Sequence, residues 1–200
     1  MLFRVPLQIL LDNTKVDTSI FRKYIVPFLL NRNENILPPE LTWVAGGYLR
    51  RLLTNDCLEN DIDISSRVLS VTECIDAFGN YHFLTKNAYV WKEDEFKKQN
   101  ITFNYNFMSQ LHLNTLEELL TSFDLTIAQF ATDGRNLYFT PNAWYDLQKK
   151  ILVKNMECKL GPTKSRLLKY IQYGYITWSD ACYEKVHSNI ETSDYKGNNE

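Results

Sequence analysis

Apolar residues recur along this chain with two periods, which predict helices alternating with short strands. Three- and four-residue spacing predicts helices over residues 16–30, 66–78, 113–123, 141–152, 163–173 and 177–190. Short apolar runs predict strands over residues 41–45, 81–91, 101–108 and 124–130. Asp133 and Gly134 are a tight-turn pair, so the last of these strands should form a hairpin with residues 136–140. The mixture predicts an α+β fold.

The chain has 200 residues, of which 44% are hydrophobic, and this is enough for one good core. We expect residues 1–160 to form a head domain that begins with a helical lead-in over residues 1–40. Residues 161–190 should form a helical C-terminal segment. Residues 191–200 are polar and contain a glycine, which predicts a disordered tail.

Two glycines end the first predicted strand. Gly46 and Gly47 follow residues 41–45, and a helical stretch over residues 48–53 comes next. Glycines at the start of a helix let backbone N–H groups approach a phosphate closely. The alternative is that they form only a tight strand-to-helix turn.

An alternating segment, Asn60-Asp61-Ile62-Asp63-Ile64, reads as the next strand. Asp61 and Asp63 should therefore point to one side, while the two isoleucines point into the core. Neighbouring carboxylates repel each other unless a divalent cation neutralises them. An isolated Asp-x-Asp often has no function, but metal and phosphate side by side are what nucleotidyl transfer requires.

At these residues the chain resembles the DNA polymerase β-like nucleotidyltransferases, most closely the head domain of CCA-adding enzymes and bacterial poly(A) polymerases. Those enzymes have Gly-Gly-x-Val-Arg-Asp-x-Leu-Leu where this chain has Gly46-Gly47-Tyr48-Leu49-Arg50-Arg51-Leu52-Leu53. Arg51 replaces the acidic residue of that motif.

Three later blocks extend the resemblance, in family order, from about residue 42 to residue 175. Ser122-Phe123-Asp124-Leu125-Thr126-Ile127 is similar to Arg-Arg-Asp-Phe-Thr-Ile, without its arginine pair. The segment Tyr145-Asp146-Leu147-Gln148-Lys149-Lys150-Ile151-Leu152 is similar to Asp-Leu-x-x-Gly-x-Ile-Arg. Pro162 with Arg166-Leu167-Leu168-Lys169-Tyr170 is similar to Pro-x-Arg-Leu-Leu-Arg-Ala.

The resemblance implies a polymerase β-like nucleotidyltransferase fold, in which a mixed sheet carries Asp-x-Asp between flanking helices and a small helical part follows. It implies transfer of a nucleoside monophosphate from an NTP to an acceptor hydroxyl, with release of pyrophosphate. Asp61 and Asp63 would hold two Mg²⁺ ions, with Mn²⁺ as the alternative metal.

Two-metal sites of this type usually need a third carboxylate. Asp124 is the candidate, because residues 81–90 and 101–108 contain no Asp or Glu. In CCA-adding enzymes, however, the block around Asp124 positions sugar and nucleotide, and the third acid lies on an earlier strand. The other interpretation of Asp124 is a residue in a helix-to-strand turn.

Basic residues complete the expected nucleotide site. Gly46, Gly47 and Arg50 should contact phosphate, Arg50 through both guanidinium nitrogens. The resemblance places Arg166 and Lys169 at the triphosphate or ribose, and their spacing of three puts them on one helix face. Either one is otherwise an ordinary surface residue.

The net charge is −2, but residues 146–169 contain seven basic and two acidic residues. A local basic segment suits a triphosphate or one RNA end better than a long duplex. We therefore expect an RNA 3′ end, from tRNA or another RNA, as acceptor, on a basic face around Lys159, Lys164, Arg166 and Lys169. For Lys149, Lys150 and Lys154, a solvated helix face is the simpler interpretation.

Two other functions stay open. In the first, the chain is a nucleotidyltransferase whose acceptor is a protein side chain or a small molecule. In the second, the chain is an inactive relative that acts as a binding or antitoxin partner. The four cysteines have no Cys-x-x-Cys spacing and indicate neither a disulfide framework nor a zinc site. No apolar run is long enough for a bilayer, and no signal peptide is recognisable, so we expect a cytoplasmic protein.

Overall fold

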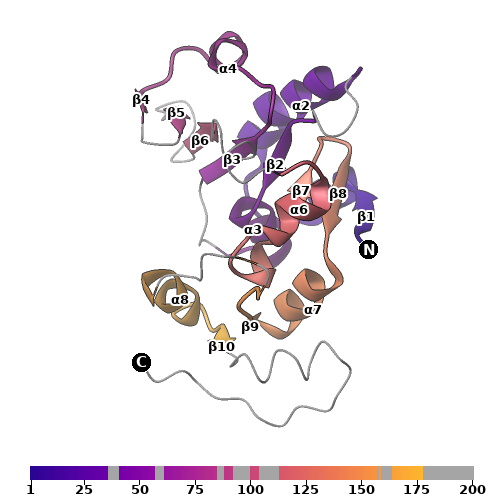
Figure 1. Ribbon diagram of the computed structural model, residues 1–200, viewed down its shortest axis with the longest axis vertical. Coiled ribbons are helices and arrows are strands. Elements are labelled where there is room, and N and C mark those ends of the chain that lie inside the picture. The colour runs from indigo at the N-terminus through magenta and orange to yellow at the C-terminus, as the bar shows by residue number, and fades with distance from the viewer. Residues whose placement is uncertain are drawn as a thin grey trace.

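A computed structural model of the chain has the predicted α+β fold, built on a mixed sheet (Figure 1). It describes residues 1–35, 41–56, 61–84, 88–91, 100–103, 113–156, 158 and 164–177. Eight strands lie in the order β1-β8-β7-β2-β3-β6-β5-β4, and a separate pair consists of β9 and β10. Strands β3 and β6 run parallel, whereas the other neighbours in the large sheet are antiparallel.

The strands are β1 (Phe3–Pro6), β2 (Trp43–Ala45), β3 (Asp61–Ser65), β4 (Phe83–Leu84), β5 (Tyr89–Trp91), β6 (Asn100–Phe103), β7 (Phe130–Thr132), β8 (Asn136–Phe139), β9 (Ile151–Leu152) and β10 (Ile176–Thr177). The α-helices are α1 (Leu7–Asn13), α2 (Val26–Asn33), α3 (Gly47–Thr54), α4 (Val71–Phe78), α6 (Leu116–Thr121), α7 (Pro141–Lys149) and α8 (Lys164–Ile171). A π-helical turn η1 (Phe21–Ile25) and a 3₁₀ turn η2 (Thr126–Ala128) complete the set. Within the described ranges, no helix has the length and apolar content needed to cross a bilayer.

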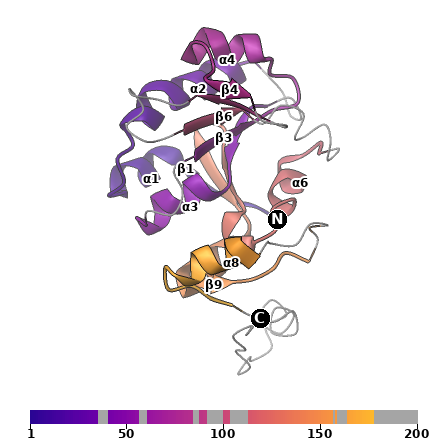
Figure 2. The same cartoon turned by 90° about the vertical axis from the view of Figure 1, so that its left-hand side faces the viewer.

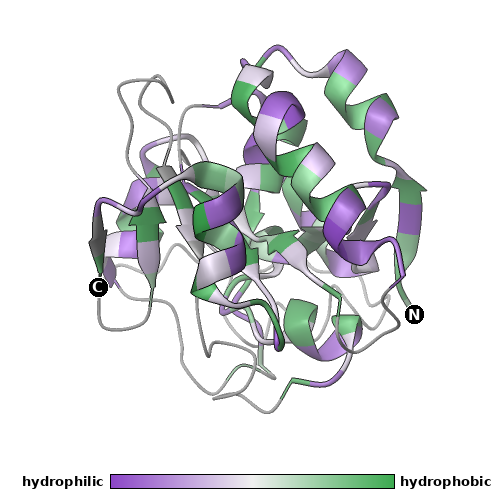
Figure 3. Ribbon diagram, turned by 90° about the horizontal axis from the view of Figure 1, so that it is seen from above, coloured by the Kyte–Doolittle hydropathy of each residue, from purple (hydrophilic) through white to green (hydrophobic). Residues whose placement is uncertain are grey.

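The two faces of the sheet carry different cores. Val44, Ile62 and Ile64 point to one face, where α1, η1, α2, α3 and α4 cover them in the main core. Trp43 and Ala45 point to the other face and pack under α6. Helix α6 lies on the side of the sheet opposite α1 and α3 (Figure 2). The helices show hydrophobic and hydrophilic residues in turn, as amphipathic helices do (Figure 3). Strand alternation thus sends successive residues of β2 and β3 to opposite layers.

The N-terminal part differs from the expected helical lead-in. β1 is an edge strand of the large sheet and pairs with β8, and only then does α1 begin. The expected helix over residues 16–30 is present but irregular, because η1 precedes α2. Pro27 lies at the start of α2 and has no amide hydrogen to bond one turn back, which is consistent with the wider turn before it. Residues 36–40 lie outside the described ranges.

The prediction of one strand over residues 81–91 was wrong. Two strands occupy this stretch, since β4 pairs antiparallel with β5. The residues between them, Thr85-Lys86-Asn87, are polar, which is a sequence signal for a break between two strands. Likewise α4 begins only after Ser70, whose hydroxyl and the side chain of Glu73 form a capping box. Val68, which lies in the predicted helix over residues 66–78 but before α4, is exposed.

The strand expected over residues 124–130 was also wrong. Leu125 makes a single bridge to Lys154, η2 follows, and β7 begins only at Phe130. The backbone here bonds to a later segment instead of the sheet: Thr126 N donates to Val153 O (3.1 Å), and Asn155 N donates to Asp124 O (2.8 Å). The hairpin of β7 and β8 around Gly134 is confirmed.

After the hairpin, α7 is shorter than the helix predicted over residues 141–152. Lys150 has a left-handed φ of 53° and ends the helix, so that Ile151 and Leu152 form β9. Helix α8 confirms the prediction for residues 163–173 within its bounds, and Gly174 follows with φ 81°. Of the last predicted helix, Thr177 belongs to β10, and residues 178–190 lie outside the described ranges, as does the expected tail.

Arg50 attaches the C-terminal elements to the head. Its guanidinium forms a buried ion pair with Asp56, and Nη1 also donates to the hydroxyl of Tyr175 (3.1 Å). The same guanidinium lies 5.2 Å from the ring centre of Tyr170 on α8 and 5.9 Å from that of Tyr175. Both tyrosines are buried in a small apolar cluster with Leu125 and neighbouring side chains. A charge from α3 thus fixes the position of α8 and β10.

Replacing Arg50 by Met should lower the free energy of unfolding by roughly 3 kcal/mol, because Asp56 would lose its buried partner. Arg51→Met is the matched control on the same helix, since Arg51 is the neighbouring arginine and its Nε donates to the backbone oxygen of Asp56 (3.1 Å). Urea unfolding measures both. Equal losses in the two variants would contradict the anchoring role of Arg50.

Asp146 is a buried carboxyl on α7. Burial raises its pKa from 3.8 to about 7, and the hydrogen bond from Thr126 Oγ1 (2.6 Å) opposes the rise. Because the folded pKa lies above the unfolded value, the folded chain holds the proton more tightly, so ionisation of Asp146 reduces stability as the pH rises from about 4 to about 7. Above about pH 7, the stability that protonated Asp146 contributes is fully lost.

Asp146→Asn should therefore flatten the pH dependence of the free energy of unfolding. The variant keeps a side-chain oxygen that can accept from Thr126, and at pH 7.5 it should be as stable as the wild type or more stable, by at most about 4 kcal/mol. Urea unfolding at pH 4.5, 6 and 7.5 measures this. Parallel pH curves for the two proteins would show that Asp146 does not titrate in this way.

Candidate functional site

The glycine pair forms a strained turn between β2 and α3. Gly46 has φ 90° and ψ −145°, and its N–H donates to Phe130 O (2.8 Å). A Cβ at Gly46 would lie 3.2 Å from the ring of Phe123. Only glycine suits this conformation and this contact. Gly47 is the first helical residue of α3, so the positive φ belongs to Gly46 alone.

The two aspartates lie on the strand next to this turn. β2 and β3 are antiparallel, with Trp43 opposite Ser65 and Val44 opposite Ile64. Continuing this register by one residue sets Asp63 beside Ala45, immediately before Gly46. Ile62 and Ile64 are fully buried on the opposite face, as the sequence predicts. Asp63 is half-buried and Asp61 is exposed.

The other neighbour of β3 is β6. Their parallel register sets Asn100 beside Asp61 and Thr102 beside Asp63. Residues in register on neighbouring strands point to the same side of a sheet. Thr102, which is half-buried, therefore belongs to the same face as Asp63.

Asp124 is not the third member of a carboxylate cluster with Asp61 and Asp63. Among the described residues, no three His, Cys, Asp or Glu side chains form a group that could hold a metal. Asp124 precedes η2 instead of β7, and its Oδ2 accepts from Arg166 Nη1 of α8 (3.0 Å). β2 separates β7 from β3 in the sheet. The expected metal-ligand role of Asp124 is therefore not supported by its position.

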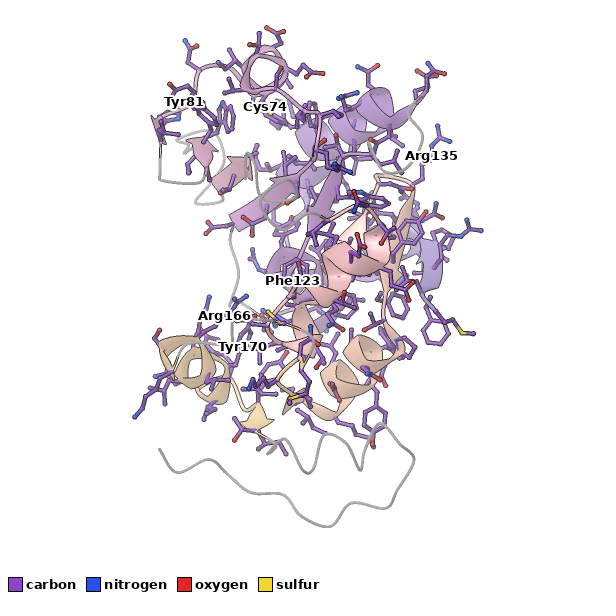
Figure 4. All side chains as sticks on the ribbon, viewed as in Figure 1. Cys74, Tyr81, Phe123, Arg135, Arg166 and Tyr170 are labelled. Atoms are coloured by element: carbon purple, nitrogen blue, oxygen red, sulfur yellow. The ribbon has the colours of Figure 1, made fainter. Side chains whose placement is uncertain are left out.

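Asp124 nevertheless has an unusual environment. Its side chain is 13% exposed, and its Oδ1 atom is buried without a hydrogen-bond partner among the described residues. A buried carboxylate oxygen normally has a donor, because leaving it unpaired costs free energy. Asp124 directly follows Phe123, whose ring packs on Gly46. Figure 4 shows Phe123 on the main body, and Arg166 on the side of α8 that faces it.

Arg50 does not have the environment expected for a phosphate ligand. It is fully buried, and both terminal guanidinium nitrogens bond to Asp56. A phosphate would have to displace that carboxylate. We therefore assign Arg50 a structural role. The sequence signal for this role is Asp56, an acidic residue six positions after Arg50.

On α8, Arg166 and Lys169 are both half-buried, and Tyr170 beside them is fully buried. Tyr170 packs in the small apolar cluster with Leu125 and Tyr175. Arg166 forms an ion pair with Asp124. Lys164 is exposed, and Lys159 lies outside the described ranges.

The donor set on β3 suits a divalent cation. Asp61 and Asp63 present two carboxylates on one face, and Mg²⁺ in phosphate-transfer sites is typically held by one or two carboxylates, substrate phosphates and water. The turn at Gly46 and the N-terminus of α3 lie beside them, where a helix favours negative charge. The arrangement can therefore hold a phosphate next to a metal ion.

Solved structures confirm the fold. A CCA-adding enzyme with ATP matches with a TM-score of 0.63 and 17% identity, over 94% of this chain and 46% of the enzyme. The structure of a CCA-adding enzyme with CTP matches with a TM-score of 0.62 and 18% identity, over 94% of this chain and 46% of the enzyme. The Thermotoga maritima CCA-adding enzyme complexed with tRNA matches with a TM-score of 0.54 and 17% identity, over 88% of this chain and 47% of the enzyme. The chain spans less than half the length of these enzymes and has their polymerase β-like nucleotidyltransferase fold.

Curated protein sequences gave no match. A family model does match, namely Gad2, described as Gabija anti-defense 2 family protein, over residues 17–150. The matched region contains β2, α3 and β3, and with them the glycine turn and the aspartate pair. Because the match covers more than half of the chain, the chain belongs to the Gabija anti-defense 2 family.

Proposed function

We propose that the chain is a divalent-metal-dependent nucleotidyltransferase. The observation that carries this proposal is the pairing of β2 with β3, which sets Asp63 next to the strained turn at Gly46. A phosphate-binding turn and a carboxylate pair are thus neighbours. The structures with ATP and CTP that share this fold support an NTP as substrate.

In this proposal the N-terminal amides of α3 orient the triphosphate, and Asp61 and Asp63 hold the divalent ion. When bound, the ion supplies charge neutralisation for the phosphates and for the departing pyrophosphate. An acceptor oxygen attacks the α-phosphorus, and the bond from that phosphorus to the pyrophosphate oxygen breaks. The acceptor proton passes to solvent.

Asp124 then contacts the nucleotide instead of the metal. Its buried Oδ1, which has no hydrogen-bond partner among the described residues, suits a donor such as a ribose hydroxyl. Arg166 holds the other carboxylate oxygen and keeps the side chain oriented. Lys169, on the same face of α8, is proposed to lie toward the phosphates.

Two acceptors have specific support. An RNA 3′ end is the first, because a similar fold is complexed with tRNA in the Thermotoga maritima enzyme. Pairing with Asp124 neutralises Arg166, however, which removes one charge from the basic face expected to bind RNA. The second acceptor is a protein of the Gabija defense, which the name of the family favours.

Asp61→Asn and Asp63→Asn should each reduce transfer from labelled NTP by at least about 100-fold. Each change removes a metal ligand and also relieves repulsion between two carboxylates, so the melting temperature should stay level or rise. Asp76→Asn, which alters an exposed acid on α4, is the control. Undiminished transfer in both variants would reject the assignment.

The acceptor is identified by incubating the protein with each α-labelled NTP, Mg²⁺, cellular RNA and purified Gabija proteins. An RNA acceptor predicts label at RNA 3′ ends and weaker RNA binding by Lys164→Glu, with NTP binding unchanged. Label on a Gabija protein supports the second acceptor. Bound NTP without any labelled product would show an inactive binding relative.

A further inference from the structure

We infer that Thr102 occupies the position of a third carboxylate beside Asp63, so that the site holds one divalent ion with the NTP instead of two. This inference rests on the proposed function and names the metal content of the same site. It differs from the sequence expectation of two ions, in which Asp124 would supply the third ligand.

The parallel register of β3 and β6 carries the first step. Thr102 is the residue in register with Asp63, and parallel neighbours lie about 4.8 Å apart. Ile62 and Ile101, also in register, are both fully buried on the opposite face. Asp63 and Thr102 therefore share the other face, and both are half-buried there.

The remaining neighbours on this face are neutral too. On β5, Val90 is in register with Thr102 and is buried. On β2, the position beside Asp63 is Ala45, in the register that Val44 and Ile64 set. Asp124 is engaged by Arg166 and forms no metal-binding group with the aspartate pair. Within the described part of the chain, Asp61 and Asp63 thus receive no third acid.

The chemistry of the two ions makes this difference consequential. An ion that accompanies the NTP obtains ligands from the β- and γ-phosphates, so two protein carboxylates are enough for it. An ion at the acceptor hydroxyl lies away from those phosphates and depends on protein carboxylates. A threonine hydroxyl is neutral and does not offset the charge of a second cation.

If the site holds only one ion, we expect it to bind NTP firmly but to activate the acceptor hydroxyl weakly. Turnover then depends on how well the true acceptor is oriented, because orientation alone lowers a large part of the barrier. Poor substitutes for that acceptor should react slowly. An aspartate at residue 102 should restore the second ion.

The test counts Mn²⁺ by electron paramagnetic resonance and calorimetry, with an α,β-methylene NTP analogue bound. We expect one Mn²⁺ per chain for the wild type and for Thr102→Val, and two for Thr102→Asp. Thr72→Asp adds the same charge on an exposed position of α4 and should stay at one. Melting temperatures show whether each variant is folded.

Two bound ions in the folded wild type would overturn the inference while leaving the proposed function intact. The wild-type count decides this even if Thr102→Asp fails to fold. Thr102→Asp that folds and still binds one ion would also overturn it. No Mn²⁺ in the wild type, or a count unchanged in Asp63→Asn, would reject the proposed function itself and the inference with it.

Discussion

The pairing of β2 with β3 is the constraint on which the site depends. Val44 and Ile64 face each other in the main core, and their burial fixes the register of the two strands. A slip by one residue would bury Asp61 and Asp63 and expose their isoleucine neighbours. The same register places Asp63 beside the residue before Gly46. Hydrophobic burial on one face of the sheet thus determines the chemistry on the other.

Much of this arrangement was readable from the sequence, because it depends on local signals. Alternation over residues 61–64 gave the strand and its inward isoleucines, and the glycine pair gave the start of α3. Gly46 had to be glycine because of its positive φ and because Phe123 packs on it; the second reason is a contact between residues 77 positions apart. No local pattern reveals such a contact.

The environments of Asp124 and Arg50 depend on contacts that neither the apolar pattern nor the family motif reveals. Asp124 begins an apolar run that looks like a strand, but its backbone bonds to Asn155 and its side chain to Arg166. Arg50 matches a family motif, yet the buried ion pair with Asp56 determines its role. Thr102 carried no signal at all, because its meaning comes from its register with Asp63. Charge partners decide what Asp124 and Arg50 can bind, whereas strand register gives Thr102 its meaning.

In the proposed nucleotidyltransferase function, a divalent ion and a triphosphate bind next to each other at the β2–α3 turn. A crystal structure with Mn²⁺ and a non-hydrolysable NTP analogue, with anomalous scattering recorded at the manganese edge, tests this most directly. We predict manganese within about 2.2 Å of carboxylate oxygens of Asp61 and Asp63, and phosphate oxygens at the N-terminal amides of α3, beginning with that of Gly47. A nucleotide bound elsewhere on the chain, with no manganese at these aspartates, would contradict it.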